Sequence, residues 1–136
     1  MNLLGLVCAL TTFFNIWLGH VAVRHIEARV ISIKLPSACF AISGLILEGG
    51  ALLSSSAILS AVLGVSGLLV LWDALELHRQ QRRVIKGHAP ANPDNPRHRH
   101  ILEEHPTANT IHWLKREPQG HPISPEELNN LRRATQ

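Results

Sequence analysis

Charge is scarce in the first 77 residues of this chain, which hold only three Lys/Arg and four Asp/Glu. Residues 78–136 have ten Lys/Arg and six Asp/Glu, together with seven of the nine His and seven of the eight Pro. A soluble domain alternates apolar residues with a polar face along its whole length. This separation therefore excludes a single soluble fold over the whole chain. It predicts a membrane module followed by a polar, basic tail.

Catalytic groupings are missing as well. We find no Ser/His/Asp, Cys/His or paired-carboxylate arrangement at a spacing that catalysis uses. The two cysteines, Cys8 and Cys39, lie in apolar stretches, where a thiol is most simply a small packing residue and a disulfide is not indicated. The sequence therefore predicts that the protein is not an enzyme, and it nominates no catalytic, cofactor-binding or metal-binding residue.

Three apolar stretches are long enough to cross a membrane, at residues 3–23, 31–53 and 57–77. The hydrocarbon core of a bilayer is about 30 Å thick and a helix rises about 1.5 Å per residue, so about 20 apolar residues span it. The predicted fold class is all-α, with three transmembrane helices followed by a largely irregular basic tail with short helices.

The middle stretch is the least uniform of the three, because Lys34, Pro36 and Glu48 interrupt it. Pro36 suits the first turn of a helix, where its missing N–H would have no partner in any case. Lys34 can extend from there to the lipid headgroups. Gly49–Gly50 and Ser54–Ser56 predict the turn into the third span.

The first stretch differs from a cleaved signal peptide. No Lys or Arg precedes Arg24, and the apolar run is longer than the roughly 7–15 residues that such a peptide contains. We therefore expect an uncleaved membrane anchor.

The distribution of Lys and Arg predicts the orientation. The first predicted loop carries Arg24, Arg29 and Lys34, the second carries none, and the tail opens with four basic residues. Three crossings put the first loop and the tail on one side, which the positive-inside rule makes the cytoplasm. We predict a multi-pass protein of the cell inner membrane, with its N-terminus outside and its tail in the cytoplasm. Trp17 and Trp72 would then both lie near the cytoplasmic interface, where aromatic rings anchor helices.

Small residues recur at helical spacing in two of the spans, which permits helices to approach closely in lipid. They are Ala38, Ala41 and Gly44 in the second span, and Ala57, Ser60, Ala61, Gly64 and Gly67 in the third. Packing of the second span on the third is the simpler interpretation. Self-association through the same face is the alternative.

Ionisable residues of the spans fall mostly near their ends, and we identify none at mid-membrane. We predict that four side chains meet as interfacial ion pairs at the cytoplasmic end, with arginines of the first loop as their partners. The four are His20, Glu27, Asp73 and Glu76, and the arginines are Arg24 and Arg29. Because a proton or ion path would need a charge at mid-membrane, transport by this chain alone is not expected.

The tail divides from the membrane module at Gly87, a typical helix stop. We therefore predict two units, a transmembrane module at residues 1–87 and a Pro/His-rich cytoplasmic tail at residues 88–136. The basic juxtamembrane segment, residues 78–87, continues the third helix and is expected to attract anionic lipid headgroups.

Within the tail, prolines at three-residue spacing over residues 89–96 predict an extended or turn-rich linker. Thr110–Arg116 combines apolar and basic residues that suit a membrane surface or a partner. Ser124–Glu127 forms a capping box, which predicts a short helix near residues 125–134.

The tail is also rich in histidine, a good ligand for zinc or nickel. The residues are His98, His100, His105, His112 and His121. Their spacings match no closed zinc motif, so solvated or interfacial histidines are the simpler interpretation. A metal-binding tail is the alternative.

Several motifs of the first 96 residues occur together in a known order. They are Gly5 in the first span, His20, Glu27, Ile58–Val65, Trp72, Glu76–Leu77, Gln80, Arg83–Val84, Lys86–Gly87, Pro90 and Asn92–Pro93. In these features the chain resembles the DUF4491 family of small bacterial membrane proteins of unknown function. It departs from that pattern at Val21, Ala28–Arg29 and His88, and the tail past Pro96 lies outside it. The resemblance implies a three-helix integral membrane protein and supplies no activity.

A non-catalytic accessory subunit or scaffold is the function that these observations favour, because no site is visible from which an activity could be argued. The expected partners are the lipid bilayer and either another membrane protein or a second copy of the chain, with no nucleic acid. One alternative is a metal-sensing or metal-handling membrane protein that uses the His-rich tail. A further alternative is an oligomeric transport component.

Overall fold

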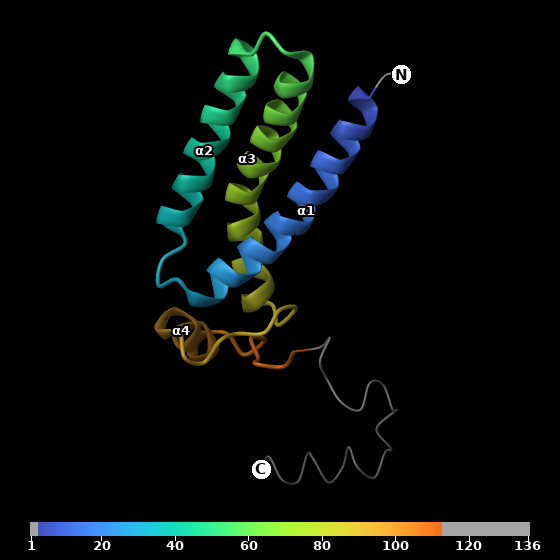
Figure 1. The fold of residues 1–136 in the computed structure, drawn as a ribbon. Helices are drawn as coiled ribbons and strands as arrows, with labels where there is room; N and C mark the ends of the chain where they lie inside the picture. The colour runs from blue at the N-terminus through green and yellow to red at the C-terminus, as the bar shows by residue number, and fades with distance from the viewer. Residues whose placement is uncertain (1–2, 113–136) are drawn as a thin grey trace, which may run out of the picture.

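The computed structural model describes residues 3–112, and within them the chain forms four helices and no strand. The helices are α1 (Leu4–Arg29), α2 (Lys34–Leu53), α3 (Ala57–Ile85) and α4 (Pro96–Glu104). The first three run up and down beside one another, and α4 lies across the end of the bundle where α1 finishes (Figure 1). The predicted all-α class is confirmed.

Three of these helices, α1, α2 and α3, are long and apolar enough to cross a membrane. The shortest, α2, has 20 residues, which at about 1.5 Å per residue covers the hydrocarbon core. Large apolar side chains cover the outside of the bundle: Phe13 is 64% exposed, Trp17 60% and Leu45 62%. A surface of this kind is unfavourable in water and suits contact with lipid.

The ends of α2 agree with the sequence prediction at one point and correct it at another. Pro36 lies in the first turn, and the turn into α3 falls at Ser54–Ser56, where the Ser56 hydroxyl accepts from the backbone N–H of Leu59. Gly49 and Gly50 are helical, so their predicted place in that turn is wrong. A Cβ on Gly50 would lie 3.4 Å from Leu63, so this glycine belongs to the packing of α2 on α3.

The helices α2 and α3 pack closely through their small residues. A Cβ on Gly67 would lie 3.0 Å from the backbone oxygen of Gly44, and the Ser60 hydroxyl donates to the backbone oxygen of Ala51 at 2.8 Å. This confirms the predicted packing of the second span on the third. The helix α1 packs on the other side of α3, where Asn15 donates to Ser66 across the interface at 3.2 Å, and it leans away toward its N-terminus (Figure 1).

The chain turns back on itself after α3. This helix ends at Ile85, and Gly87 follows with a positive φ of 71°, as expected for a glycine helix stop. Residues 88–112, which we call the α4 lobe, then fold under the ends of α1 and α3 (Figure 1). An apolar core joins the lobe to α3. It consists of Val84, Ala89, Ala91 and Ile101.

The helix α4 begins at an Asn-Pro pair at the end of the predicted linker, residues 89–96. The Asn95 side chain accepts from the backbone N–H of Arg97, and Pro96 occupies the first helical position, where it needs no N–H partner. Of the other segments predicted in the tail, Thr110–Arg116 lies mostly outside the described residues, and 125–134 lies wholly outside them.

Candidate functional site

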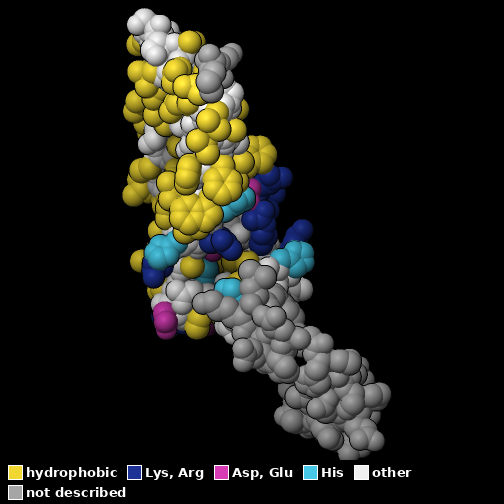
Figure 2. All heavy atoms as spheres, turned by 45° about the vertical axis from the view of Figure 1, so that its right-hand side comes forward, with side chains coloured by type: hydrophobic (Ala, Val, Ile, Leu, Met, Phe, Trp, Pro, Cys, Tyr) yellow, Lys and Arg dark blue, Asp and Glu magenta, His cyan; other side chains and the backbone are white. Residues whose placement is uncertain are grey.

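Buried polar side chains gather where α1 and α3 meet the α4 lobe, a region that we call the basic end of the bundle. They are Glu27, Glu76, Gln80, Asn95 and His98, and each is at most 5% exposed. A buried polar group without partners costs a few kcal/mol, so their contacts determine how this end is held together. Figure 2 shows Lys, Arg and His side chains collected directly below the apolar surface.

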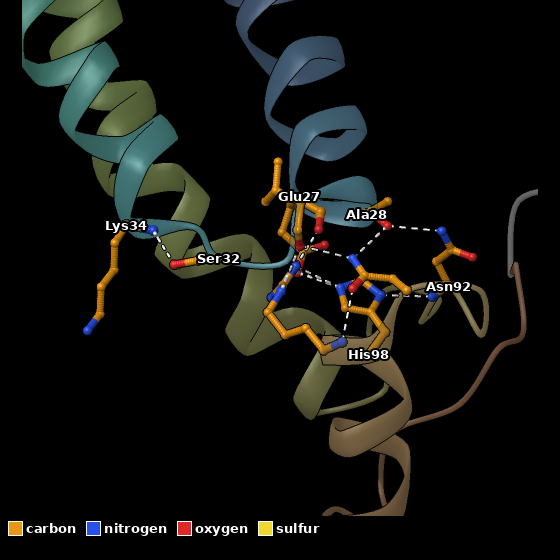
Figure 3. A network of polar contacts seen from close by, with 9 residues as sticks. Glu27, Ala28, Ser32, Lys34, Asn92 and His98 are labelled. Atoms are coloured by element: carbon orange, nitrogen blue, oxygen red, sulfur yellow. Dashed lines mark hydrogen bonds and ion pairs between the residues drawn. The ribbon is translucent and has the colours of Figure 1, made fainter.

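Glu27, in the last turn of α1, is the acceptor at the centre of the first network. Its Oε1 lies 3.0 Å from Arg97 Nη2 and 3.0 Å from His98 Nε2, and both partners come from α4. Arg97 also donates to the backbone oxygens of Glu27 and Val30. The Glu27 and His98 side chains are 1% and 0% exposed, so water does not screen this contact. Figure 3 shows the His98 ring directed toward Glu27 on one side and Asn92 on the other.

The contacts of His98 fix its tautomer. The backbone N–H of Asn92 donates to Nδ1 at 2.8 Å, so Nδ1 carries a lone pair and Nε2 carries the hydrogen. Nε2–H then donates to Glu27.

Two asparagines of the lobe complete the end of α1. The last carbonyls of a helix have no partner within it. Here the Asn92 and Asn95 amides both donate to the backbone oxygen of Ala28, at 3.0 and 3.1 Å, and Asn95 also donates to Val30 at 3.0 Å. Asn95 therefore caps α4 with its oxygen and α1 with its nitrogen.

Glu76 forms the second network, within α3. Its Oε1 lies 2.5 Å from Arg83 Nη2, and its Oε2 lies 3.7 Å from Arg79 Nη1. The Arg79 guanidinium stacks 5.1 Å from the centre of the Trp72 ring. Arg83 also donates to Gln80 at 3.0 Å, so the acid is matched by basic residues one and two turns further along the same helix.

Asp73 lies where α1 and α3 cross. A Cβ on Gly19 would lie 2.5 Å from Asp73 Oδ2, so a side chain there would displace the Asp73 carboxylate. Asp73 is also close enough to His20 and Glu76 to interact electrostatically with both. The structure thus brings His20, Asp73 and Glu76 together, and it places Glu27 on the neighbouring network.

The predicted arginine partners of these acids are wrong. Arg24 donates through Nε to the backbone oxygen of His20, and Arg29 contacts His25 at 2.9 Å, each one turn back along α1. In residues 3–112 no ion pair includes either arginine. The acids are matched instead by the extension of α3 and by α4. The Asn95-Pro96 pair is the signal in the sequence that could have placed a helix, with Arg97 and His98 in its first turn.

Two adjoining clefts open between α1 and α3 at this end, with volumes of about 650 and 390 Å³. They share Val21, Arg24, Gln80 and Arg83. The smaller is bordered by Trp17 on the apolar side of the bundle, and the larger reaches the α4 lobe.

The Glu48 carboxyl lies further along the bundle than its place near the end of α2 suggests. Its Oε1 would lie 2.9 Å from a Cβ on Gly67, and Gly67 is ten residues after Ala57 at the start of α3. That separation is about 15 Å, half of the hydrocarbon thickness of about 30 Å. In the described part of the chain the Glu48 carboxyl makes no hydrogen bond and no ion pair.

The tail histidines and the two cysteines do not gather into one group in the described residues. Both ring nitrogens of His98 are engaged, and His100 pairs with Glu104 on the exposed side of α4 at 3.5 Å. Within residues 3–112 no three His, Cys, Asp or Glu side chains are grouped as a metal site requires. Cys8 and Cys39 are free thiols, and His121 lies outside the described residues.

These features define the class of protein. It is a three-helix membrane protein whose basic end is covered by a lobe that is ion-paired to α1. Its sequence matches the family described as "Domain of unknown function (DUF4491)" over residues 2–95, so the chain belongs to that family. The match ends at Asn95, one residue before α4 begins. No curated protein and no solved structure is similar enough to match the chain.

Proposed function

We propose that the protein is a non-catalytic accessory subunit or scaffold of the bacterial inner membrane. In this proposal the tail, residues 88–136, is the part that binds a partner, and the α4 lobe fixes the tail to the membrane module. One observation carries this proposal: the buried contact of Glu27 with Arg97 and His98, which ties the lobe to α1. The buried charges at this end serve to fix the lobe, and Asn92 and Asn95 add bonds to the same helix end. A fixed lobe holds residues 88–112 at a set position on the membrane module.

Purification of the full chain from native membranes tests this proposal. Wild type and Glu103→Gln, which alters an exposed residue of α4, should both retain a stoichiometric partner. Glu27→Gln should lose it, because the lobe is released. Recovery of the wild type as a lone protein would contradict the proposal, and so would equal retention by Glu27→Gln.

The proposed orientation places the N-terminus outside and the basic end in the cytoplasm. Every Lys and Arg of residues 3–112 lies at or near the basic end, whereas the turn at Ser54–Ser56 carries none. In a variant with both native cysteines replaced by Ala, a new cysteine at Ser55 should react with an impermeant thiol reagent in intact cells. A cysteine at Asn109 should react only after lysis. The reverse pattern would overturn the orientation.

Glu48 favours a second candidate, an oligomeric transport component. A carboxyl at mid-membrane is unfavourable unless it meets a donor, a cation or water. It lies against Gly64 and Gly67 with no partner in the described residues, so a neighbouring copy or a passing ion would supply one. In proteoliposomes this candidate predicts a proton or cation flux that Glu48→Gln abolishes and Glu103→Gln preserves. Flux no greater than that of empty liposomes would exclude it.

A further inference from the structure

We propose that the cleft between α1 and α3 at the basic end is a phosphate-binding site, with Arg24 and Arg29 as its principal ligands. The phosphate belongs either to a lipid headgroup or to a soluble compound. Glu27 lines the same cleft, but its ion-pair partners are Arg97 and His98. The inference rests on Arg24 and Arg29 and does not depend on the proposed scaffold function.

The first support is a pair of uncompensated arginines. Arg24 and Arg29 both line the larger cleft. In residues 3–112 their only polar contacts are with His20 and His25, which supply no negative charge. Two guanidinium groups beside one cleft repel each other, and an anion between them would relieve that repulsion.

The acids on the walls of the clefts do not supply that anion. Glu27 is matched by Arg97 and His98, and Glu76 is matched by Arg79 and Arg83. Each acid is therefore neutralised by residues other than Arg24 and Arg29, and the space between α1 and α3 keeps a positive field. His25 and His88 also line the larger cleft and add donors to it.

Gln80 adds a buried donor to the same space. Its side chain lines both clefts and is 5% exposed. Its oxygen accepts from Arg83, which leaves the amide N–H₂ as the group that can bond an occupant. Guanidinium and amide donors that converge in this way suit the several oxygens of a phosphate.

The position of the clefts identifies where such a phosphate would come from. The smaller cleft is bordered by Trp17, Val21 and Val23, at the edge of the apolar surface. A tryptophan ring such as that of Trp17 typically lies at the depth of the lipid headgroups. An apolar border on one side and arginines on the other fit the phosphate of an anionic lipid, and a soluble phosphate would enter the larger cleft from the water.

The test compares two double variants of the full chain that remove the same charge. Arg24→Gln/Arg29→Gln changes the cleft, whereas Arg82→Gln/Lys86→Gln changes exposed juxtamembrane residues outside both linings. In one arm, native mass spectrometry measures retention of phosphatidylglycerol from mixed nanodiscs. In the other arm, calorimetry measures binding of inorganic phosphate in detergent.

The cleft variant should bind at least about tenfold more weakly in one arm, since a charged hydrogen bond contributes that much. The control lies in the juxtamembrane segment that attracts anionic lipid in general, so it measures that general attraction. Its retention of phosphatidylglycerol should fall less than that of the cleft variant, and its binding of inorganic phosphate should change by less than about twofold. A loss in the lipid arm assigns a headgroup, and a loss in the phosphate arm assigns a soluble ligand. Equal losses in both variants would reduce the effect to general basic attraction and overturn the site, as would no binding by wild type in either arm. If melting curves show the double variant to be unstable, the single variants Arg24→Gln and Arg29→Gln, each at an exposed side chain, carry the same comparison.

Discussion

The two ends of the bundle are held together by different forces. Toward the Ser54–Ser56 turn, α2 and α3 meet through glycine and serine, and most large side chains face outward. At the basic end lie all of the largest fully buried side chains. They are Leu77, His98, Glu27, Val23 and Val84.

This difference follows from the two solvents. Lipid provides no hydrophobic drive between helices, so close backbone approach and single hydrogen bonds hold the spans together. Water provides that drive, and the α4 lobe accordingly has an apolar core of the soluble kind around Val84 and Ile101. The basic end is where a membrane fold becomes a soluble one, and buried charge marks the boundary.

Removal of the central acid should produce the largest effect. Glu27→Ala removes the carboxylate shared by Arg97 and the buried His98, which costs about 3–5 kcal/mol in the free energy of unfolding. Chemical unfolding in mild detergent measures it. Glu103→Ala on the exposed face of α4 is the control and should stay within about 0.5 kcal/mol of wild type. Similar values for the two variants would mean that the network stabilises nothing.

A bulky residue between the spans should produce the next largest effect. Gly67→Leu places its Cβ 2.9 Å from Glu48 and 3.0 Å from the Gly44 oxygen, so α2 and α3 must separate, at a cost of about 1–3 kcal/mol. Gly49→Leu is the control, because nothing lies within 4 Å of a Cβ there. The melting temperature in detergent distinguishes them. Equal melting temperatures would contradict the observed packing of α2 on α3.

The double cap at Asn95 should contribute less. Asn95→Ala removes the acceptor for α4 and the donor for the last carbonyls of α1, and we expect a loss of about 1–2 kcal/mol. Asn95→Asp keeps the acceptor and loses the donor, so its loss separates the two roles. If Asn95→Asp is as stable as wild type, the bonds to Ala28 and Val30 are dispensable.

The side-chain hydrogen bond between α1 and α3 should contribute least. Asn15→Ala removes the contact with Ser66, and bonds of this kind average about 0.6 kcal/mol in membrane proteins. A double-mutant cycle with Ser66→Ala isolates the coupling between the two side chains. A coupling above about 2 kcal/mol would show that the membrane part is held by polar contacts after all.

Most of the fold could be predicted from the sequence because the bilayer imposes a length and an apolar character on each span. The three spans, Pro36 in the first turn of α2 and the stop at Gly87 all follow from local chemistry. The depth of Glu48 did not follow, because its position near the end of α2 hides how far the side chain reaches along α3.

The site was harder to predict because its partners are distant in the sequence. Glu27 lies 70 residues from Arg97 and 71 residues from His98. The acids were predicted correctly, but the prediction paired them with the cations of the first loop, Arg24 and Arg29. The chain instead folds back under α1 through a proline-rich segment whose sequence predicts a linker. Only the Asn95 cap showed locally that a helix begins there.

Hydrogen exchange of the α4 amides, residues 97–104, tests most directly the claim that the Glu27 contact docks the lobe on the membrane module. A nine-residue helix is marginal by itself, so protection of these amides must come from docking. In wild type they should be protected, and in Glu27→Gln they should exchange about 100-fold faster, as expected for the loss of a buried pair. Equal exchange rates in the two proteins, fast or slow, would contradict the account.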